Sequence, residues 1–142
     1  MRRFAMPCLL LAALSACATP SPGPPRARPS GAPSVQGEAC PTHKLRFSRE
    51  TGCMNDGSVE FCLPTGDEAL LARVKALAPS IEANPSRGRA GCDLPKETLY
   101  FIPTGETECE ARHGALTPAA WTMVCDVAAL PEVRKLVPTW YE

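Results

Sequence analysis

The sequence predicts a small α+β domain stapled by disulfide bonds, and three observations point to this fold class. Residues 38–142 contain six cysteines, short runs rich in β-branched and aromatic residues, and longer runs with apolar residues at helical spacing. Strand and helix patterns that occur together in such a short chain indicate a sheet packed against helices. We therefore expect a short, mostly antiparallel sheet with two or three helices on one of its faces.

The first predicted strand covers residues 58–63. Apolar and polar side chains alternate along it, as in a strand that packs one face on a core. Glu60 is expected to face water, and the side chains expected to face the core are Val59, Phe61 and Leu63. The upstream residues 44–48 are expected to form a hairpin with this strand, with the turn at or near Asp56-Gly57.

The second predicted strand covers residues 98–102, which are apolar from Leu99 onward. An unbroken apolar run predicts a strand that is buried on both faces. Pro64 and Pro103 directly follow the two predicted strands. Each proline is expected to end its strand, because it has no backbone N–H to donate to a neighbouring strand.

The first predicted helix follows the first predicted strand, residues 58–63, and its start is marked by capping residues. Thr65 and Glu68 form a Thr-x-x-Glu capping box, and Asp67 adds favourable negative charge to the first turn. Asn84-Pro85 is expected to end the helix. The spacing of its apolar residues places them on one helical face. These residues are Leu70, Leu71, Val74, Leu77 and Ile81.

The second predicted helix starts at Thr117-Pro118, with threonine as the N-cap and proline in the first turn. It runs towards Leu130, where Pro131 interrupts it. Its apolar face consists of Trp121, Val124, Cys125 and Ala128. Residues 133–137 fit either a helix or a strand.

Residues 52–79 resemble residues 91–118 at an offset of thirty-nine positions, with ten identities in twenty-eight aligned positions. Both segments contain Gly-Cys and, further on, Pro-Thr-Gly. The similarity predicts an old duplication of a strand–Pro-Thr-Gly–helix unit, and the alternative is chance similarity in a chain rich in Ala, Pro and Gly. In the second copy, Thr104 and Glu106 are expected to start a shorter helix.

The first residues of the chain have the order of an export signal. Arg2 and Arg3 precede an apolar run that reaches Leu14, and small residues follow before Cys17. The apolar run is shorter than the roughly 20 residues that a transmembrane helix needs. The four residues Leu14-Ser15-Ala16-Cys17 resemble the lipobox of bacterial lipoproteins.

The lipobox resemblance implies that residues 1–16 are a signal peptide that is removed and that Cys17 carries lipid. Lipid on this cysteine would hold the protein to a membrane of the cell envelope. Ala18 follows the cysteine, which favours the outer membrane, on its periplasmic or surface face, if the bacterium is Gram-negative.

Residues 17–37 begin with the lipid-bearing cysteine and continue as a linker rich in Pro, Ser, Ala and Gly. This composition predicts disorder, because it offers too little apolar surface to bury. The following domain, residues 38–142, carries 11 basic and 15 acidic residues. Its mild negative charge does not favour nucleic acid or anionic lipid as a partner.

The cysteines of the domain are even in number, which in a small exported domain implies a disulfide framework. Up to three bridges are expected, and the pairing is left open. The candidates are Cys40, Cys53, Cys62, Cys92, Cys109 and Cys125.

His113 follows Cys109 by four residues, so a helix would place both on one face. With Glu108 and Glu110 beside them, they form a candidate zinc or copper site. We favour the alternative, in which Cys109 forms a disulfide and His113 is a solvated side chain. No metal and no cofactor is therefore expected.

No pattern of catalytic residues stands out in the sequence. It contains neither Gly-x-Ser-x-Gly nor Cys-x-x-Cys. The carboxylate pairs Asp67/Glu68 and Glu106/Glu108 are expected to be helix-start charges rather than a pair that cleaves glycans. Trp121 and Trp140-Tyr141 are aromatic candidates for a partner contact, although packing on the core is favoured.

Two hypotheses of function remain. The first is a non-catalytic binding or structural module of the envelope, with a protein, peptide or cell-wall component as its partner. The alternative is an envelope hydrolase that acts on cell-wall polymer or peptide through carboxylates or His113.

Overall fold

The structure is a computed structural model, and it describes residues 39–54 and 57–140. The predicted signal peptide, Cys17 and the linker lie outside these residues, as do Asp56, the Trp140 side chain and Tyr141. Among the helices described, none is both long and apolar enough to cross a membrane.

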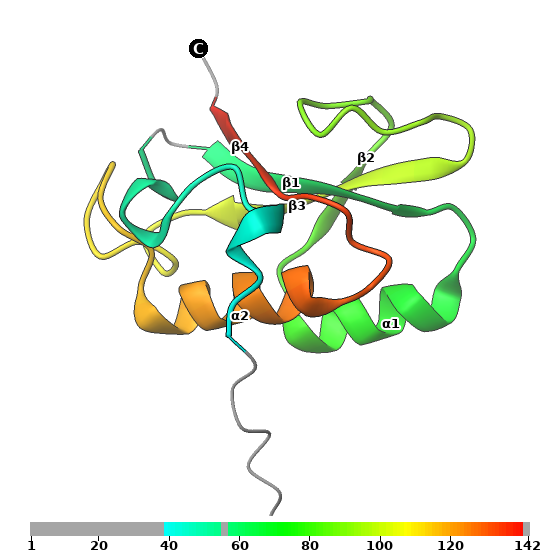
Figure 1. Cartoon of the computed structure of the whole chain (residues 1–142). Coiled ribbons are helices and arrows are strands. Elements are labelled where there is room, and N and C mark those ends of the chain that lie inside the picture. Colours follow the sequence, from blue (N-terminus) through cyan, green and yellow to red (C-terminus); the bar gives the residue numbers. More distant parts are fainter. Residues whose placement is uncertain (1–38, 55–56, 141–142) are drawn as a thin grey trace, which may run out of the picture. The chain divides into compact units, whose positions relative to one another are not determined.

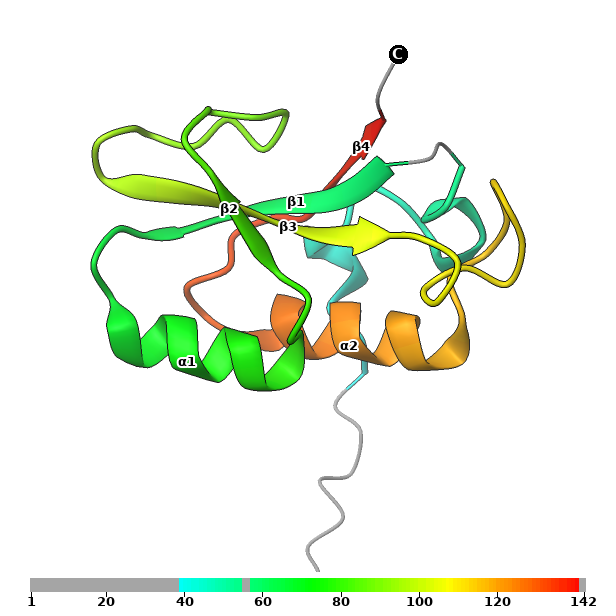
Figure 2. The same ribbon diagram turned by 180° about the vertical axis from the view of Figure 1, so that it is seen from behind.

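The described part of the chain forms a four-stranded antiparallel sheet with helices on one face (Figure 1 and Figure 2). The strand order is β2-β3-β1-β4. The strands are β1 (Gly57–Pro64), β2 (Glu82–Asn84), β3 (Glu97–Thr104) and β4 (Val137–Trp140). The helices are α1 (Glu68–Leu77) and α2 (Pro118–Ala129), and short 3₁₀ helices cover Thr42–Lys44 and Arg49–Thr51. The α+β prediction is confirmed.

The central strand β1 pairs with β3 along its whole length, from Gly57 opposite Thr104 to Pro64 opposite Glu97. On its other edge, β4 pairs with the first half of β1. Residues 133–137 fitted either a helix or a strand. In the structure, residues 133–135 have no regular secondary structure, Leu136 forms an isolated bridge with Leu45, and Val137 begins β4.

The predicted hairpin between residues 44–48 and β1 is wrong, because β3 and β4 occupy both edges of β1. Lys44 and its neighbours lie instead beside Leu136, whose N–H donates to the Lys44 carbonyl at 2.9 Å. The Lys44 ammonium group also donates to the carbonyl oxygens of Ala128 at 2.8 Å and Leu130 at 3.0 Å. A positive charge at the end of α2 is favourable, because the last carbonyls of a helix lack partners within the helix.

The core lies between the sheet and the helices. Val59, Phe61 and Leu63 face it and are at most 1% exposed, as predicted. Full burial of one side chain of this size stabilises the fold by about 1.5–3 kcal/mol. The buried helix residues that meet the sheet are Leu70 and Val74 of α1 and Ala120, Val124, Val127 and Ala128 of α2.

Asp67, not Thr65, is the N-cap of α1. The Asp67 carboxylate accepts a hydrogen bond from the N–H of Leu70 at 2.9 Å. The predicted Thr65 capping box is wrong because Thr65 lies in the turn between β1 and α1, and its hydroxyl bonds the hydroxyl of Thr98 at 2.9 Å. Gly66, with a φ of 84°, then turns the chain into the helix.

The ends of the helices follow the predictions in part. α1 stops at Leu77, so the buried Ile81 lies in the segment after the helix rather than on its apolar face. α2 starts as predicted, with the Thr117 hydroxyl accepting from the N–H of Ala120 at 3.2 Å and Pro118 in the first turn.

β3 differs from its prediction at two points. Leu99 and Ile102 are each 1% exposed, but Tyr100 and Phe101 are only partly buried. Pro103 does not end the strand, which continues for one more residue. β2 pairs with β3 over residues 99–101, so Pro103 lies beyond this pairing, at an edge where a missing N–H is tolerated.

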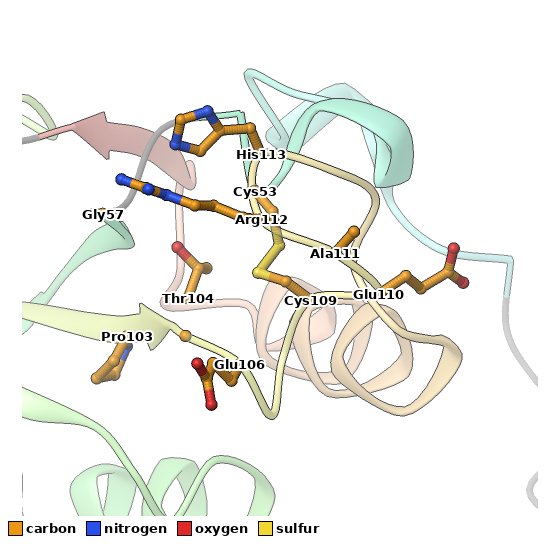
Figure 3. A pocket seen from close by; sticks show the side chains of 11 residues that line it. Cys53, Gly57, Pro103, Thr104, Glu106, Cys109, Glu110, Ala111, Arg112 and His113 are labelled. Carbon is orange, nitrogen blue, oxygen red and sulfur yellow. A yellow bond between two sulfur atoms is a disulfide. The ribbon is translucent and has the colours of Figure 1, made fainter.

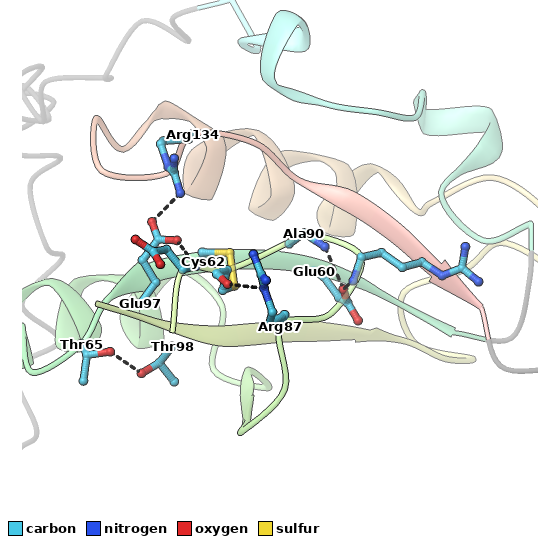
Figure 4. The surroundings of a disulfide bond; sticks show 11 residues. Glu60, Cys62, Thr65, Arg87, Ala90, Glu97, Thr98 and Arg134 are labelled. Atoms are coloured by element: carbon cyan, nitrogen blue, oxygen red, sulfur yellow. Dashed lines mark hydrogen bonds and ion pairs between the residues drawn. A yellow bond between two sulfur atoms is a disulfide. The ribbon is translucent and has the colours of Figure 1, made fainter. Parts of the chain in front are cut away.

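Glu60 does not face water as predicted, because the loop between β2 and β3 covers it. The Glu60 carboxylate accepts hydrogen bonds from the N–H groups of Arg89 at 2.7 Å and Ala90 at 3.2 Å (Figure 4). Glu60 is only 7% exposed. Gly88 has a φ of 56°, and a Cβ there would lie 2.4 Å from the carboxylate. The loop can therefore approach Glu60 this closely only with glycine at that position.

The three disulfides expected of the domain are present among its described cysteines. The bonds are Cys40–Cys125, Cys53–Cys109 and Cys62–Cys92. They join residues 85, 56 and 30 positions apart in the sequence. Bonds that close such long loops stabilise a small domain by restricting its unfolded chain, typically by about 2–4 kcal/mol each.

The duplication is not confirmed. The segment of the second copy that corresponds to α1 forms turns rather than a helix, so the short helix predicted at Thr104 and Glu106 is wrong. Leu70, a core residue of α1, corresponds in the second copy to Cys109. The bond from Cys109 to Cys53 holds this segment in a different conformation.

The Glu60 contacts predict the effect of replacing its carboxylate. Glu60→Leu leaves two backbone N–H groups without their acceptor, so the free energy of unfolding should fall by about 2 kcal/mol. Urea denaturation measures this change, and hydrogen exchange at Arg89 and Ala90 should accelerate. The control is Glu82→Leu on the exposed strand β2. Equal effects of the two substitutions would contradict the role given to Glu60.

Candidate functional site

A pocket of about 640 Å³ lies at the end of β3, where the strand gives way to the loop 105–113 (Figure 3). Its volume is within the range of small-molecule binding sites. Strand residues, the Cys53–Cys109 disulfide and the loop itself form its walls. The residues that line it include Pro103, Thr104, Glu106, Ala111, Arg112 and His113.

The loop that forms one wall is held by its own hydrogen bonds. The Glu108 carboxylate accepts from the N–H of Gly105 at 3.0 Å and from the hydroxyl of Thr107 at 2.7 Å. The N–H of Glu110 donates to the carbonyl of Ala115 at 2.9 Å. Together with the disulfide to Cys53, these contacts make the wall a defined structure rather than a loose connection.

The floor of the pocket contains a hydroxyl group that lacks a hydrogen-bond partner within residues 39–54 and 57–140. Thr104 is 8% exposed, and its Oγ1 atom is buried without a partner. Figure 3 shows this oxygen pointing from the strand toward the space below Arg112. A buried hydroxyl left without a partner costs about 1–3 kcal/mol, so its presence needs an explanation.

Opposite charges line the pocket from different sides. Figure 3 shows Arg112 and His113 on one side and Glu106 on the other, with Thr104 between them. Arg112 and His113 each also take part in a further interaction. Glu110 points away from the pocket and forms an ion pair with Arg49.

His113 has a backbone φ of 61°, in the left-handed region. A residue with a Cβ is disfavoured there by about 1–2 kcal/mol, although histidine is found there more often than most. Such strain is tolerated where the surrounding structure enforces it, and it concentrates at functional sites. The turn formed by residues 111–114, closed by a 2.9 Å bond from Gly114 N to the Ala111 carbonyl, supplies this constraint.

The candidate metal ligands predicted on one helical face are not on a helix. Cys109 is bonded to Cys53, Glu108 bonds within its loop and Glu110 pairs with Arg49. Within the described ranges, no three or more His, Cys, Asp or Glu residues are grouped so that they could hold a metal ion. The favoured alternative for Cys109, a disulfide, is confirmed.

The other candidate residues have clear structural positions. Asp67 and Glu68 lie at the start of α1, as expected of helix-start charges. Trp121 is half-buried and packs edge-on against Phe47, with ring centroids 6.5 Å apart. Glu106 was predicted to start a helix, and the structure places it in the pocket instead. Its position just after a buried strand was a usable signal, because such loops often carry binding residues.

Comparison with known proteins places the chain in no family. No family model matches it, and no curated protein or solved structure matches it either.

The left-handed conformation at His113 predicts an unusual order of stabilities. His113→Gly should be more stable than His113→Ala by about 1 kcal/mol, because both lose the imidazole and glycine alone adopts this φ without strain. At the neighbouring Ala111, the change Ala111→Gly should instead destabilise by about 0.5–1 kcal/mol. Urea denaturation measures all of these differences. The strain is absent if glycine is the less stable choice at both positions.

Proposed function

We propose that the protein is a lipid-anchored envelope lipoprotein whose domain is a non-catalytic binding module. Its partner is an envelope protein, a peptide or a cell-wall component. The observation that carries the binding role is the pocket at the end of β3. There the Thr104 hydroxyl lies between opposite charges and has no partner among the described residues.

The disulfides support a location outside the cytosol. Bonds of this kind form and persist in oxidising compartments, and small exported domains depend on them. The three bonds between the described cysteines fit this setting. The residues Leu14-Ser15-Ala16-Cys17 supply the proposed anchor.

The arrangement of the pocket side chains supports binding over catalysis. Acid–base catalysis requires groups within hydrogen-bond reach of the same reacting atoms. His113 and Glu106 lie on opposite sides of the pocket in Figure 3, and Glu110 is turned toward Arg49. These positions fit contacts to the two ends of a ligand better than a shared catalytic centre.

An envelope hydrolase is the second candidate, because His113 and Glu106 line the same pocket. Incubation of the purified protein with isolated cell wall and with peptides, followed by mass spectrometry, tests it. Fragments released by the native protein but not by Glu106→Gln or His113→Ala would replace the binding proposal with this one.

The anchor is tested by two matched cysteine substitutions. Cys17→Ser should move the protein from the membrane fraction to the soluble fraction, because the acylated thiol is lost. Cys8→Ser should have no effect, because Cys8 lies in the signal peptide. Intact mass of the native protein should show acyl chains on a chain that begins at Cys17. An unacylated chain that begins at Met1 would refute the anchor.

The binding role is tested by filling the pocket. Ala111→Trp places a large side chain at an exposed position of the pocket wall, and Ala119→Trp places the same side chain on α2, outside the pocket. Cross-linking and pull-down from solubilised envelope should recover a reproducible partner with the native protein and with Ala119→Trp. Ala111→Trp should lose it. Equal recovery with both variants, or no partner with the native protein, would contradict the proposal.

A further inference from the structure

The charges of the pocket restrict the kind of ligand that fits it. A purely anionic ligand in contact with Arg112 and His113 would also contact the Glu106 carboxylate, which repels it. A purely cationic ligand in contact with Glu106 would be repelled by Arg112. Like charges brought together at an interface cost several kcal/mol. The complementary ligand is therefore dipolar, with a negative group toward Arg112 and a positive group toward Glu106. The guanidinium group has five N–H donors, so it can hold a ligand in addition to its existing contact.

The Thr104 hydroxyl adds a requirement for the middle of the ligand. It lies between the charged sides and is buried without a partner in the part of the chain that the structure describes. A peptide group carries both an N–H donor and a carbonyl acceptor, so it can pair with a hydroxyl in either orientation. A peptide bond placed over Thr104 would remove the cost of its burial.

The remaining walls are suited to small side chains. Pro103, Ala111 and the Cys53–Cys109 disulfide offer apolar surface of limited size. The pocket volume of about 640 Å³ is too large for a lone ion and fits a ligand of several residues.

From this geometry we propose that the pocket binds a short peptide with both ends free and small side chains. Its carboxylate faces Arg112 and His113, a peptide group pairs with Thr104, and its ammonium group faces Glu106. The proposal rests on the binding role argued above and assigns its ligand class.

The test uses the mature full-length protein in detergent micelles and trialanine as the probe, with isothermal titration calorimetry as the measurement. Trialanine should bind saturably. N-acetyl-trialanine and trialanine amide should each bind about tenfold more weakly, because each lacks one charge. The assignment is refuted if trialanine does not bind at about 10 mM, or if the blocked forms bind equally well.

Two variants test whether Glu106 and Thr104 contribute to trialanine binding. Glu106→Gln should abolish the difference between trialanine and its N-acetyl form, because the group that recognises the ammonium end is gone. Thr104→Val should weaken trialanine binding about tenfold. The matched control is Thr139→Val, which removes another buried hydroxyl without a partner among the described residues, outside this pocket.

Both threonine variants should retain or raise the melting temperature, because an apolar group replaces an unsatisfied one. A loss of affinity that is equal in Thr104→Val and Thr139→Val would refute the role of Thr104. An unchanged discrimination against N-acetyl-trialanine in Glu106→Gln would refute that of Glu106. If trialanine fails while the Ala111→Trp pull-down behaves as expected, the binding module stands and only the peptide assignment falls.

Discussion

The strand β1 is the element on which the rest of the domain depends, because it is used on both edges and both faces. Its edges pair with β3 and β4, and its alternate residues Val59 and Phe61 meet the helices. On the opposite face, Glu60 holds the backbone of the β2–β3 loop and Cys62 bonds covalently to it. A strand alternates its side chains between two faces, so a shift by one residue would exchange the helix-facing core with these loop contacts.

The candidate site is a product of where β1 and β3 stop. Gly57 and Thr104 are paired at the last position of the ladder, and both line the pocket. After Thr104 the chain continues as the loop 105–113, and the Cys53–Cys109 bond holds this loop. The sheet therefore supplies a rigid floor and the disulfide a rigid wall, which together hold binding groups in place before a ligand arrives.

Sequence patterns predicted those elements whose signals are local. The core-facing residues of β1 and the Thr117 cap of α2 follow from spacing within a few residues. The burial of Glu60 could not be predicted, because the N–H groups that bind it come from a loop 29 and 30 residues away. The pocket was missed for the same reason: it combines a strand end, a distant cysteine and a loop that local signals assigned to a helix. The disulfide bond at Cys109 holds this loop in a non-helical conformation, despite the local helix signals.

The position of the Cys40–Cys125 bond has a mechanical consequence. It links Cys40, which precedes Lys44 and both 3₁₀ helices, directly to α2. Tension between the proposed anchor and a partner held in the pocket would enter α2 at Cys125 and leave at Thr117, next to the pocket loop. A pull on the tether would then be carried in part along the axis of α2.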